Sequence, residues 1–349
     1  MNTYAQPDSG RDNPDLSIVI VNFNTRRLVC ECLHSIFTQP PRCSFEVFAV
    51  DNGSTDGSCE AIAGQFPGVK LIQNECNLGF SEANNQALRL ARGDYLMLLN
   101  SDTLVLPGSI DRMLQAMAVH SQVGVLGPRL LYPDGRIQGS YGGMPTVFAY
   151  FVHLLNMSFL VPDFFWRLLS RTQMLNQLGS TISTYGLWHA DAPPVTRELP
   201  EDVFVIGACM LIRRACMERV GFLDSEFFLY IDDADYCKRV HDTGWKILFF
   251  SESEIMHLKG GTAGSNHRRN VHAYYGWLYF LRKHRGAAAF ASAKLIAVLS
   301  LLMRVLVDSF ISRQRARETW DLFVAVLRAD GRRHFSAERG ASKLFALGS

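Results

Sequence analysis

Short apolar runs alternate with amphipathic helical segments through the first hundred residues, and this alternation constrains the fold more than any other feature. The runs at 16–21, 45–50, 69–73 and 95–99 have the length of buried strands, and segments of helical periodicity separate them. Strands that alternate with helices form a parallel sheet covered on both faces. The sequence therefore predicts an α/β fold with a mostly parallel, Rossmann-like sheet flanked by helices.

Polar side chains stand directly after three of these runs. Asn22 follows the first run, Asp51 follows the second, and Asn100 and Asp102 follow the fourth. In an open α/β sheet ligands bind beyond the carboxyl ends of the strands, so these residues mark a candidate site. Neither GxGxxG nor GxxxxGK[ST] follows any of the runs, which argues against a dinucleotide-dependent oxidoreductase and against a P-loop NTPase.

Composition restricts the partners and the compartment. The 349 residues carry a net charge of only +2 and are 48% hydrophobic, which indicates neither a disordered chain nor a nucleic-acid-binding surface. The eight cysteines show no CxxC spacing, so we interpret them as reduced packing residues. Residues 1–15 are polar and contain no apolar segment typical of a signal peptide, so we expect a disordered N-terminus and a cytoplasmic protein.

The pattern becomes less regular in the second part of the chain. Residues 144–171 form an insert rich in apolar and aromatic side chains, and regular strands and helices resume over about 200–286. A mostly apolar segment then leads into the C-terminal part of the chain. We expect one domain over 16–286 and a helical tail over 287–349.

Asp102 and Asp51 each allow two interpretations from the residues alone. Asp102 follows a buried strand and can reach a divalent cation that bridges two phosphates, because hard cations prefer carboxylate oxygen. It equally suits the cap of the helix expected after Pro107. Asp51 can accept the imide N–H of uracil or thymine, with Phe23 against the ring. Equally, Asp51 suits a strand-to-helix turn and Phe23 suits the core.

Three carboxylates, those of Asp232, Asp233 and Asp235, stand together at a predicted helix start. Residues three apart share a helix face, whereas consecutive residues point about 100° apart, so Asp233 faces away from the other two. The helix dipole favours carboxylates in any first turn, but one placed over a cleft can act as a general base. His257 ends a short strand before a glycine-rich loop and is the leading candidate for a metal-binding histidine, although a lone histidine is more often a structural residue.

Eight segments stand in a fixed order along the chain: SIVIVNFNT, VDNGSTDGS, NLGFSEANNQAL, LLNSDT, GPRLLYPDG, VIGACMLIRR, FFLYIDDADYCKRVHDTGW and MHLKGG. Each segment alone is a weak signal, but their order and spacing form a specific one. Over about residues 16–285 they resemble the inverting GT-A glycosyltransferases of family 2, especially the bacterial rhamnosyltransferase-like branch. The resemblance implies a GT-A fold in which 16–130 binds a nucleotide sugar and 200–286 carries the acceptor and catalytic side.

The resemblance also implies a role for individual residues. Asp51 matches the base-binding aspartate, and Asp102 matches the second carboxylate of the DxD element, with His257 completing a site for Mg²⁺ or Mn²⁺. Asp233 matches the catalytic base, which takes the proton of an acceptor hydroxyl as that hydroxyl attacks the anomeric carbon with inversion. The remaining expected contacts are Asn22, Phe23 and Asn100 at the nucleotide, Asn77, Gly79 and Phe80 beside the diphosphate or sugar, and Gly207 and Ala208 at the acceptor.

The chain departs from the family pattern at two positions. Asn100 stands at the first DxD position, where it is a weaker, neutral ligand, and Asp232 begins an acidic pair that often begins with Glu. The QxxRW motif of processive polysaccharide synthases is absent from the sequence, which favours the transfer of a single sugar.

The resemblance implies a donor and an acceptor. The leading donor is a dTDP-linked deoxysugar such as rhamnose, and the leading acceptor is a polyprenyl-diphosphate-linked saccharide in cell-surface polysaccharide synthesis. A UDP-hexose transferase of the same fold and a non-catalytic nucleotide-sugar-binding module are the alternatives.

The apolar segment 287–311 is interrupted by Lys294, Arg304 and Asp308. The stretch between Lys294 and Arg304 is shorter than the ~20 residues that span a bilayer. On a helical wheel the three charged residues fall within an arc of roughly 80°, which leaves a broad apolar face. We expect a helix on the membrane surface, with a helix packed on the protein's own core as the alternative. Later arginines favour contact with anionic lipid: Arg313, Arg315, Arg317, Arg332 and Arg333.

Overall fold

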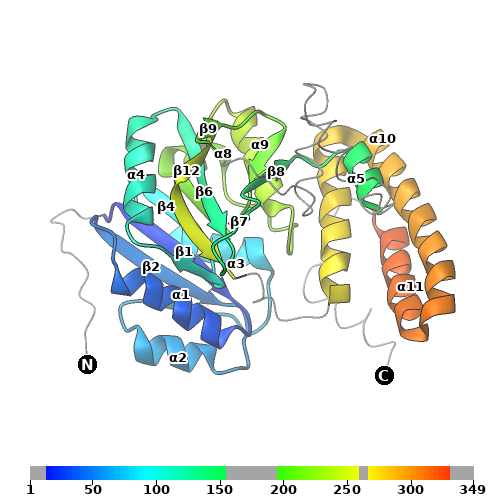
Figure 1. Ribbon diagram of the computed structural model, residues 1–349, viewed down its shortest axis with the longest axis horizontal. Helices are drawn as coiled ribbons and strands as arrows, with labels where there is room; N and C mark the ends of the chain where they lie inside the picture. The colour runs from blue at the N-terminus through cyan, green and yellow to red at the C-terminus, as the bar shows by residue number, and fades with distance from the viewer. Residues whose placement is uncertain (1–12, 155–194, 259–265, 331–349) are drawn as a thin grey trace. The chain divides into compact units, whose positions relative to one another are not determined.

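The computed structural model describes residues 13–154, 195–258 and 266–330 (Figure 1). The chain divides into two compact units. The sheet unit consists of residues 1–141, 190–225 and 236–263, and the helical unit consists of residues 142–189, 226–235 and 264–349. The predicted disorder of residues 1–12 and most of the predicted apolar insert, from 155 to 171, lie outside the described residues.

The sheet unit begins with the four expected strands. They are β1 (Leu16–Asn22), β2 (Phe45–Asp51), β3 (Lys70–Gln73) and β4 (Tyr95–Asn100). They lie side by side in the order β3-β2-β1-β4 and are parallel throughout, as the alternation with helices predicts. Strands β1 and β2 are buried along almost their whole length, which is the burial expected when helices cover both faces of a parallel sheet.

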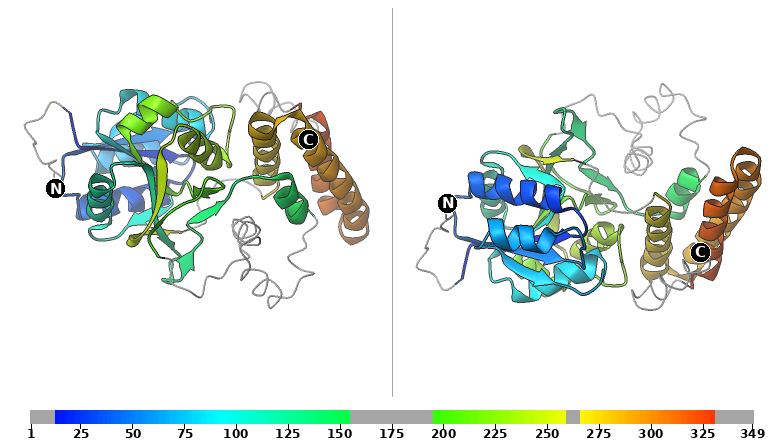
Figure 2. Two further views of the ribbon diagram at one scale, coloured as in Figure 1. Left: turned by 90° about the horizontal axis from the view of Figure 1, so that it is seen from above. Right: turned by 90° about the horizontal axis from the view of Figure 1, so that it is seen from below.

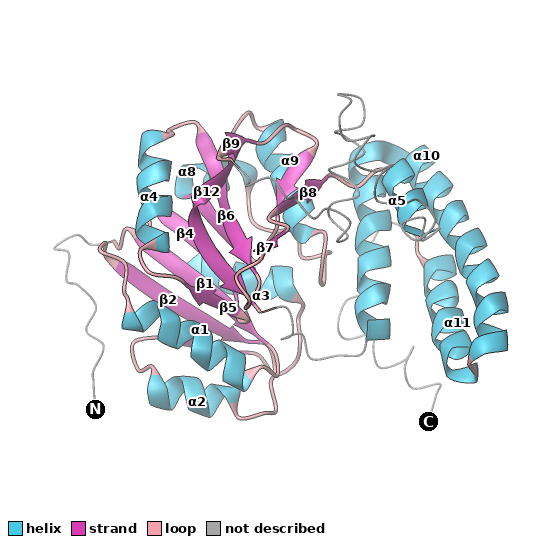
Figure 3. Cartoon of the chain, viewed as in Figure 1, coloured by secondary structure: helices cyan, strands magenta, loops and turns pink. Residues whose placement is uncertain are grey.

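Beyond β4 the sheet is mixed rather than mostly parallel. Its further strands are β5 (Thr103–Val105), β6 (Val123–Leu131), β7 (Ile137–Gln138), β9 (Arg197–Glu198), β11 (Cys209–Arg213) and β12 (Lys246–His257). The order continues as β4-β11-β6-β12-β5, and β11 runs antiparallel to both of its neighbours. Figure 3 shows the strands of this sheet in magenta. The short strands β8 (Tyr141–Gly143) and β10 (Val203–Val205) lie outside this order.

Side-chain alternation along the strands divides the core between the two faces of the sheet. Leu16, Ile18 and Ile20 of β1 pack into one apolar cluster with the helices that follow β1 and β2, whereas the intervening Val19 points to the other face. The helices of this unit are α1 (Arg26–Thr38), α2 (Ser58–Gln65), α3 (Phe80–Leu90), α4 (Ser109–Val119) and α8 (Arg214–Val220). This two-sided packing leaves the carboxyl edge of the parallel strands for polar residues.

The helical unit contains α5 (Val147–Leu154), α10 (Asn266–Ile311) and α11 (Arg313–Arg328), and the two views of Figure 2 show α10 and α11 as a helical hairpin. The apolar helical segment predicted over 287–311 belongs to α10, together with residues 266–285 before it. The two parts are divided by a kink at Gly286, whose φ of 87° is a conformation that favours glycine. The division between the two units falls inside α9 (Asp232–Asp242), directly after Asp235.

Candidate active site

Strand register brings the predicted polar residues to one edge of the sheet. Strand β1 pairs with both β2 and β4, so that Asn22 lies opposite Asp51 and Val21 lies opposite Asn100. Asn22 Nδ2 donates a hydrogen bond to Asp51 Oδ2 at 2.8 Å, and both side chains are buried. Buried amides and carboxylates require hydrogen-bond partners, so this pair fixes the ends of β1 and β2 together.

Asp51 also closes the turn that follows β2. The backbone N–H of Ser54 donates to Asp51 Oδ1 at 2.8 Å, so the turn chemistry expected for Asp51 is present. Each carboxylate oxygen carries two lone pairs, so Asp51 keeps acceptor capacity for a further donor. Phe23, the residue expected against a base, is half-buried and does not belong to the buried core.

Asn52 is a residue that the sequence pattern marked only as part of a turn. Its Nδ2 donates to Asn77 Oδ1 at 2.9 Å and to Gly79 O at 3.2 Å. Its Oδ1 accepts from Asn74 Nδ2 at 3.1 Å and from the backbone N–H of Leu78 at 3.0 Å. The side chain is 2% exposed. Asn52 therefore fixes the loop that carries Asn77 and Gly79, two of the predicted donor contacts.

Asp102 and His257 meet where β5 and β12 pair. His257 lies opposite Thr103 in this antiparallel pair, which brings His257 Nε2 to 3.3 Å from Asp102 Oδ1. The backbone N–H of Leu258 donates to Asp102 O at 2.9 Å. Gly108, with a left-handed backbone and no side-chain cap, precedes α4. The alternative interpretation of Asp102 as the cap of that helix is therefore wrong.

The proton on His257 is placed by Gln138, which the sequence gave no reason to choose. Gln138 Nε2 donates to the backbone O of His257 at 3.2 Å, and this bond fixes which end of the amide is the donor. Gln138 Oε1 then lies 2.6 Å from His257 Nδ1 and can only accept. Nδ1 must therefore carry a proton. In the neutral ring Nε2 then carries a lone pair instead of a proton, and Nε2 is the nitrogen that lies beside Asp102.

Two acceptors at this separation fit neighbouring ligands of one cation. Bonds of about 2.0–2.2 Å to a metal give ligand pairs about 3.0–3.6 Å apart, and the distance between Asp102 Oδ1 and His257 Nε2 is 3.3 Å. In the described part of the chain no three His, Cys, Asp or Glu side chains gather as a metal site. A cation held here needs further oxygen ligands from a substrate or from water, as Mg²⁺ does in phosphate-binding sites.

Asn100, Gly207 and Ala208 lie close to one another in the chain's folded form. The backbone N–H of Asn100 donates to Ala208 O at 3.0 Å, at the point where β4 meets β11. Ala208 is buried and Gly207 is half-buried. The predicted acceptor segment is therefore joined by its backbone to the first position of the DxD-like element.

The acidic residues at the start of α9 belong to the helical unit. Asp232 and Asp235 are buried and Asp233 is partly exposed, as the helical wheel predicts. Burial raises the pKa of Asp232 well above its usual range, and the nearby charges of Asp233 and Asp235 raise it further. The protonated form, which cannot accept a proton, is therefore favoured at Asp232. Asp233 is the carboxylate that solvent can reach.

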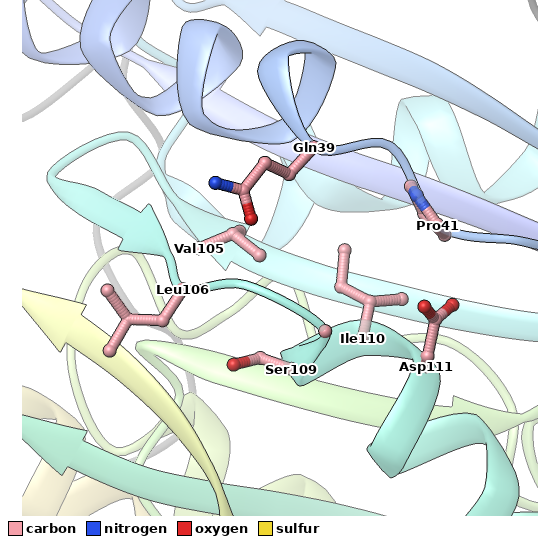
Figure 4. A pocket seen from close by; sticks show the side chains of 8 residues that line it. Gln39, Pro41, Val105, Leu106, Ser109, Ile110 and Asp111 are labelled. Carbon is pink, nitrogen blue, oxygen red and sulfur yellow. The ribbon is translucent and has the colours of Figure 1, made fainter.

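A small hollow in the sheet unit lies between the end of α1 and the start of α4 (Figure 4). Its lining is formed by Gln39, Pro41, Val105, Leu106, Gly108, Ser109, Ile110 and Asp111. Two of its polar atoms already have partners, because Ser109 Oγ donates to Glu254 O at 2.7 Å and Asp111 Oδ1 accepts from the backbone N–H of Arg42 at 2.9 Å. None of the lining residues belongs to the predicted site, and we assign no ligand to this hollow.

Comparison with known proteins identifies the family. Residues 17–176 match the model described as Glycosyl transferase family 2. The chain is a glycosyltransferase, and these residues are its family 2 domain. The enzyme is similar to the N-acetylglucosaminyl-diphospho-decaprenol L-rhamnosyltransferase of Mycobacterium tuberculosis strain H37Rv, with 26% identity over 81% of this chain and 89% of that protein. It is also similar to the O-antigen biosynthesis protein RfbC of Myxococcus xanthus, with 25% identity over 71% of this chain and 17% of that protein.

Solved structures support the GT-A fold of the enzyme. GalNAc-T7 with UDP, GalNAc and Mn²⁺ aligns with a TM-score of 0.51 and 17% identity, over 78% of this chain and 48% of that chain. The mannosyltransferase PcManGT of Pyrobaculum calidifontis, in complex with GDP-Man and Mn²⁺, aligns with a TM-score of 0.50 and 15% identity, over 93% of this chain and 89% of that chain. At these identities the likeness concerns the fold alone.

Replacing Asn52 by Asp tests the role of its amide. Asn52→Asp keeps the shape but turns the donor toward Asn77 Oδ1 and Gly79 O into an acceptor, so two bonds are lost and a buried charge is gained. We expect the free energy of unfolding to fall by about 1–3 kcal/mol. Backbone amides of residues 74–80 should exchange faster with deuterium. The exposed Gln73→Glu is the matched control, and equal exchange in both variants would contradict the role of Asn52.

Proposed function

We propose that this glycosyltransferase transfers one sugar, with inversion, from a nucleotide donor to a lipid-linked saccharide. The leading donor is dTDP-L-rhamnose, and the product is an intermediate in cell-surface polysaccharide synthesis. Asp51 and Asn22 with Phe23 serve the nucleotide, Asp102 and His257 hold a divalent cation, and Asp233 is the general base. This assignment extends to the individual residues of the chain what the family implies.

The facing pair of Asp102 and His257 is the observation that carries the proposal. Gln138 directs the lone pair of His257 Nε2 at a carboxylate oxygen 3.3 Å away, an arrangement that a cation between them stabilises. A divalent cation held by Asp102 and His257 would supply positive charge beside a diphosphate leaving group. Asn100, which replaces the first carboxylate of the DxD element, lowers the negative charge of this site.

The proposed substrates rest on the relative from Mycobacterium tuberculosis, whose name describes rhamnose transfer to a diphospho-decaprenol-linked saccharide. That relative matches most of both chains, whereas the O-antigen protein matches a small part of a longer one. A carboxylate that accepts the imide N–H of a pyrimidine serves thymine and uracil alike, so a UDP-hexose is the alternative donor. A non-catalytic nucleotide-sugar-binding module is the alternative function.

The proposed general base follows from the different environments of two adjacent carboxylates. Burial favours the protonated form of Asp232, whereas Asp233 is partly exposed. In the mechanism, Asp233 removes the proton of the acceptor hydroxyl while the C–O bond to the anomeric carbon forms and the bond to the nucleotide diphosphate breaks. The anomeric carbon of the transferred sugar is inverted because the acceptor attacks it from the face opposite the nucleotide diphosphate leaving group.

We also place the enzyme at the cytoplasmic face of a membrane, as a peripheral protein. In the part of α10 that follows the kink, residues 287–311, the side chains of Ala293, Ala297 and Leu301 are buried. Lys294 Nζ donates a hydrogen bond to Ala329 O at 2.6 Å. Other apolar side chains of this part are exposed instead: Leu295, Leu299, Leu302, Met303, Leu306, Val307, Phe310 and Ile311. These exposed residues oppose the alternative of a helix covered by the protein's own core.

Charge at the start of α11 suits an anionic lipid surface. Arg313, Arg315 and Arg317 are exposed directly after the apolar end of α10. By length and composition α10 also passes as a membrane-crossing helix, a criterion that buried helices of soluble proteins meet as well. Extraction from membranes by alkaline carbonate distinguishes the two, because it releases a surface-bound protein and leaves a spanning one.

Donor binding with and without Mn²⁺ tests the function and the metal site together. By calorimetry we expect the enzyme to bind dTDP-rhamnose more tightly than UDP-glucose, and more tightly with Mn²⁺ than without. Asp102→Ala should abolish the gain from Mn²⁺, and Gln138→Leu should reduce it by about 10–100-fold because His257 loses its orientation. Asp134→Ala removes an exposed carboxylate and is the control. An undiminished gain from Mn²⁺ in folded Asp102→Ala would remove Asp102 from the site.

Replacing Asp233 separates chemistry from binding. Asp233→Asn keeps the shape but cannot accept a proton, so we expect turnover to fall by roughly 10²-fold or more while donor affinity is unchanged. Asp232→Asn should have a milder effect, because that carboxyl already favours its protonated form. The measurement is steady-state transfer to a synthetic lipid-linked saccharide. If Asp232→Asn is inactive and Asp233→Asn is active, the general base is Asp232 and not Asp233. If both variants are fully active, the proposed mechanism is wrong.

Charges placed on the exposed face of α10 test the membrane surface. Leu299→Glu combined with Leu302→Glu should weaken binding to liposomes that contain anionic lipid by about tenfold or more, because two apolar side chains are lost from the contact. Activity on a water-soluble acceptor should be retained. Val119→Glu, at the exposed last residue of α4, is the control for an added charge. Equal liposome binding by the double variant and the parent refutes contact through this face.

A further inference from the structure

The two residues that precede the acidic helix start have an unusual backbone. Tyr230 has a φ of 68° and Ile231 a φ of 66°. Left-handed conformations are uncommon outside glycine and are outliers for a β-branched residue. Such strain persists only where the surrounding structure over-determines it, and it concentrates at functional sites. A specific contact must therefore hold this turn.

Helix α10 supplies that contact through a glycine. A Cβ atom at Gly276 would lie 3.1 Å from the backbone O of Tyr230 and 3.3 Å from Ile231 Cγ1. These distances are too short for ordinary packing, so any side chain at position 276 displaces the turn or the helix. Phe227 packs edge-on against Tyr279 one turn along α10, with ring centroids 4.9 Å apart. Gly276 thus allows the strained turn to seat directly on the helix backbone.

The other side of the strained turn is held by ion pairs to a buried carboxylate. Asp235 is fully buried, and its Oδ1 lies 2.7 Å from Lys283 Nζ and 2.7 Å from His284 Nε2, both on α10. The backbone N–H of Asp235 donates to Ile231 O at 2.9 Å, so the ion pair is joined to the strained residue by the first hydrogen bond of α9. A buried carboxylate that loses such partners is strongly destabilised.

We propose that Gly276 and Lys283 are positioning residues for the base: the N-terminal part of α10, residues 266–285, sets where Asp233 points. Asp233 lies between the strained turn and Asp235, and both of these are fixed to α10 by the contacts above. The inference rests on the proposed role of Asp233 as the base. The strain is thereby used to hold one carboxylate partly exposed while Asp232 and Asp235 remain buried.

Two variants test the positioning role. Gly276→Ala should lower kcat by about tenfold or more with the KM for the donor unchanged, because the base moves while the nucleotide contacts remain. Gly64→Ala is the matched control, since a Cβ on that α2 glycine meets nothing within 4 Å. Lys283→Met should lower kcat in the same way, and Lys283→Arg should restore most of it. If Gly276→Ala fails to fold, the two Lys283 variants decide.

The outcomes separate this inference from the function beneath it. If Asp233→Asn is inactive while Gly276→Ala and Lys283→Met keep the parental kcat, the base is correct and its positioning by α10 is refuted. If Asp233→Asn is fully active, the base itself is wrong. A fall in kcat that accompanies an equal rise in donor KM indicates general damage to the fold and also refutes a specific positioning role.

Discussion

The hydrogen bond between Asn22 and Asp51 is the constraint on which the arrangement of the carboxyl edge of the parallel strands depends. Strands β1 and β2 are covered by helices on both faces, so a polar side chain buried in them needs a hydrogen-bond partner. Ser17 and Glu46 form such a pair at the amino ends of the two strands, and Asn22 and Asp51 form one at the carboxyl ends. The same edge continues through Asn52, whose amide is satisfied on both sides by the loop after β3. One buried polar network therefore sets both the turn and the loop.

Two carboxylates of the enzyme, those of Asp102 and Asp233, lie in different physical surroundings. Asp102 lies beside a histidine whose Nδ1 proton is held by a glutamine, so in the neutral ring Nε2 and the carboxylate are two neighbouring acceptors. Asp233 is instead set apart from its neighbours by burial, which raises the pKa of Asp232, and by the ion pair that Asp235 forms with Lys283. The first arrangement suits a cation, because its acceptors converge. The second suits a proton acceptor, because only one of three clustered carboxylates is both partly exposed and distinct in its surroundings.

Much of the fold was predictable because it depends on local pattern. The four parallel strands and their polar ends follow from period and length, and the contrast between Asp233 and its two neighbours follows from helix geometry alone. The antiparallel insertion of β11 was not predictable, since nothing in the run Cys209–Arg213 records its partners. Gln138 is separated from His257 by 119 positions and carries no motif, so only the register of the folded sheet reveals it. The left-handed backbone at Ile231 is a conformation that a β-branched residue rarely adopts, so the sequence around Ile231 does not predict it. Its contact with Gly276 of α10 is visible only in the folded structure.

Gly286 explains how one long helix can serve two purposes. Before it, α10 is tied to the acidic turn through Gly276 and Lys283, contacts that tolerate little movement. After it, α10 buries Ala293, Ala297 and Leu301 and exposes a row of large apolar side chains, an arrangement that suits a soft, variable surface such as lipid. A continuous helix would transmit any tilt of the second part into the first as a rigid rod. A backbone with φ of 87° and ψ of −177° interrupts the ladder of helical hydrogen bonds at one residue, and only glycine adopts it without strain. The kink thus permits the part with the exposed apolar face to adjust while the part that contacts the acidic turn does not.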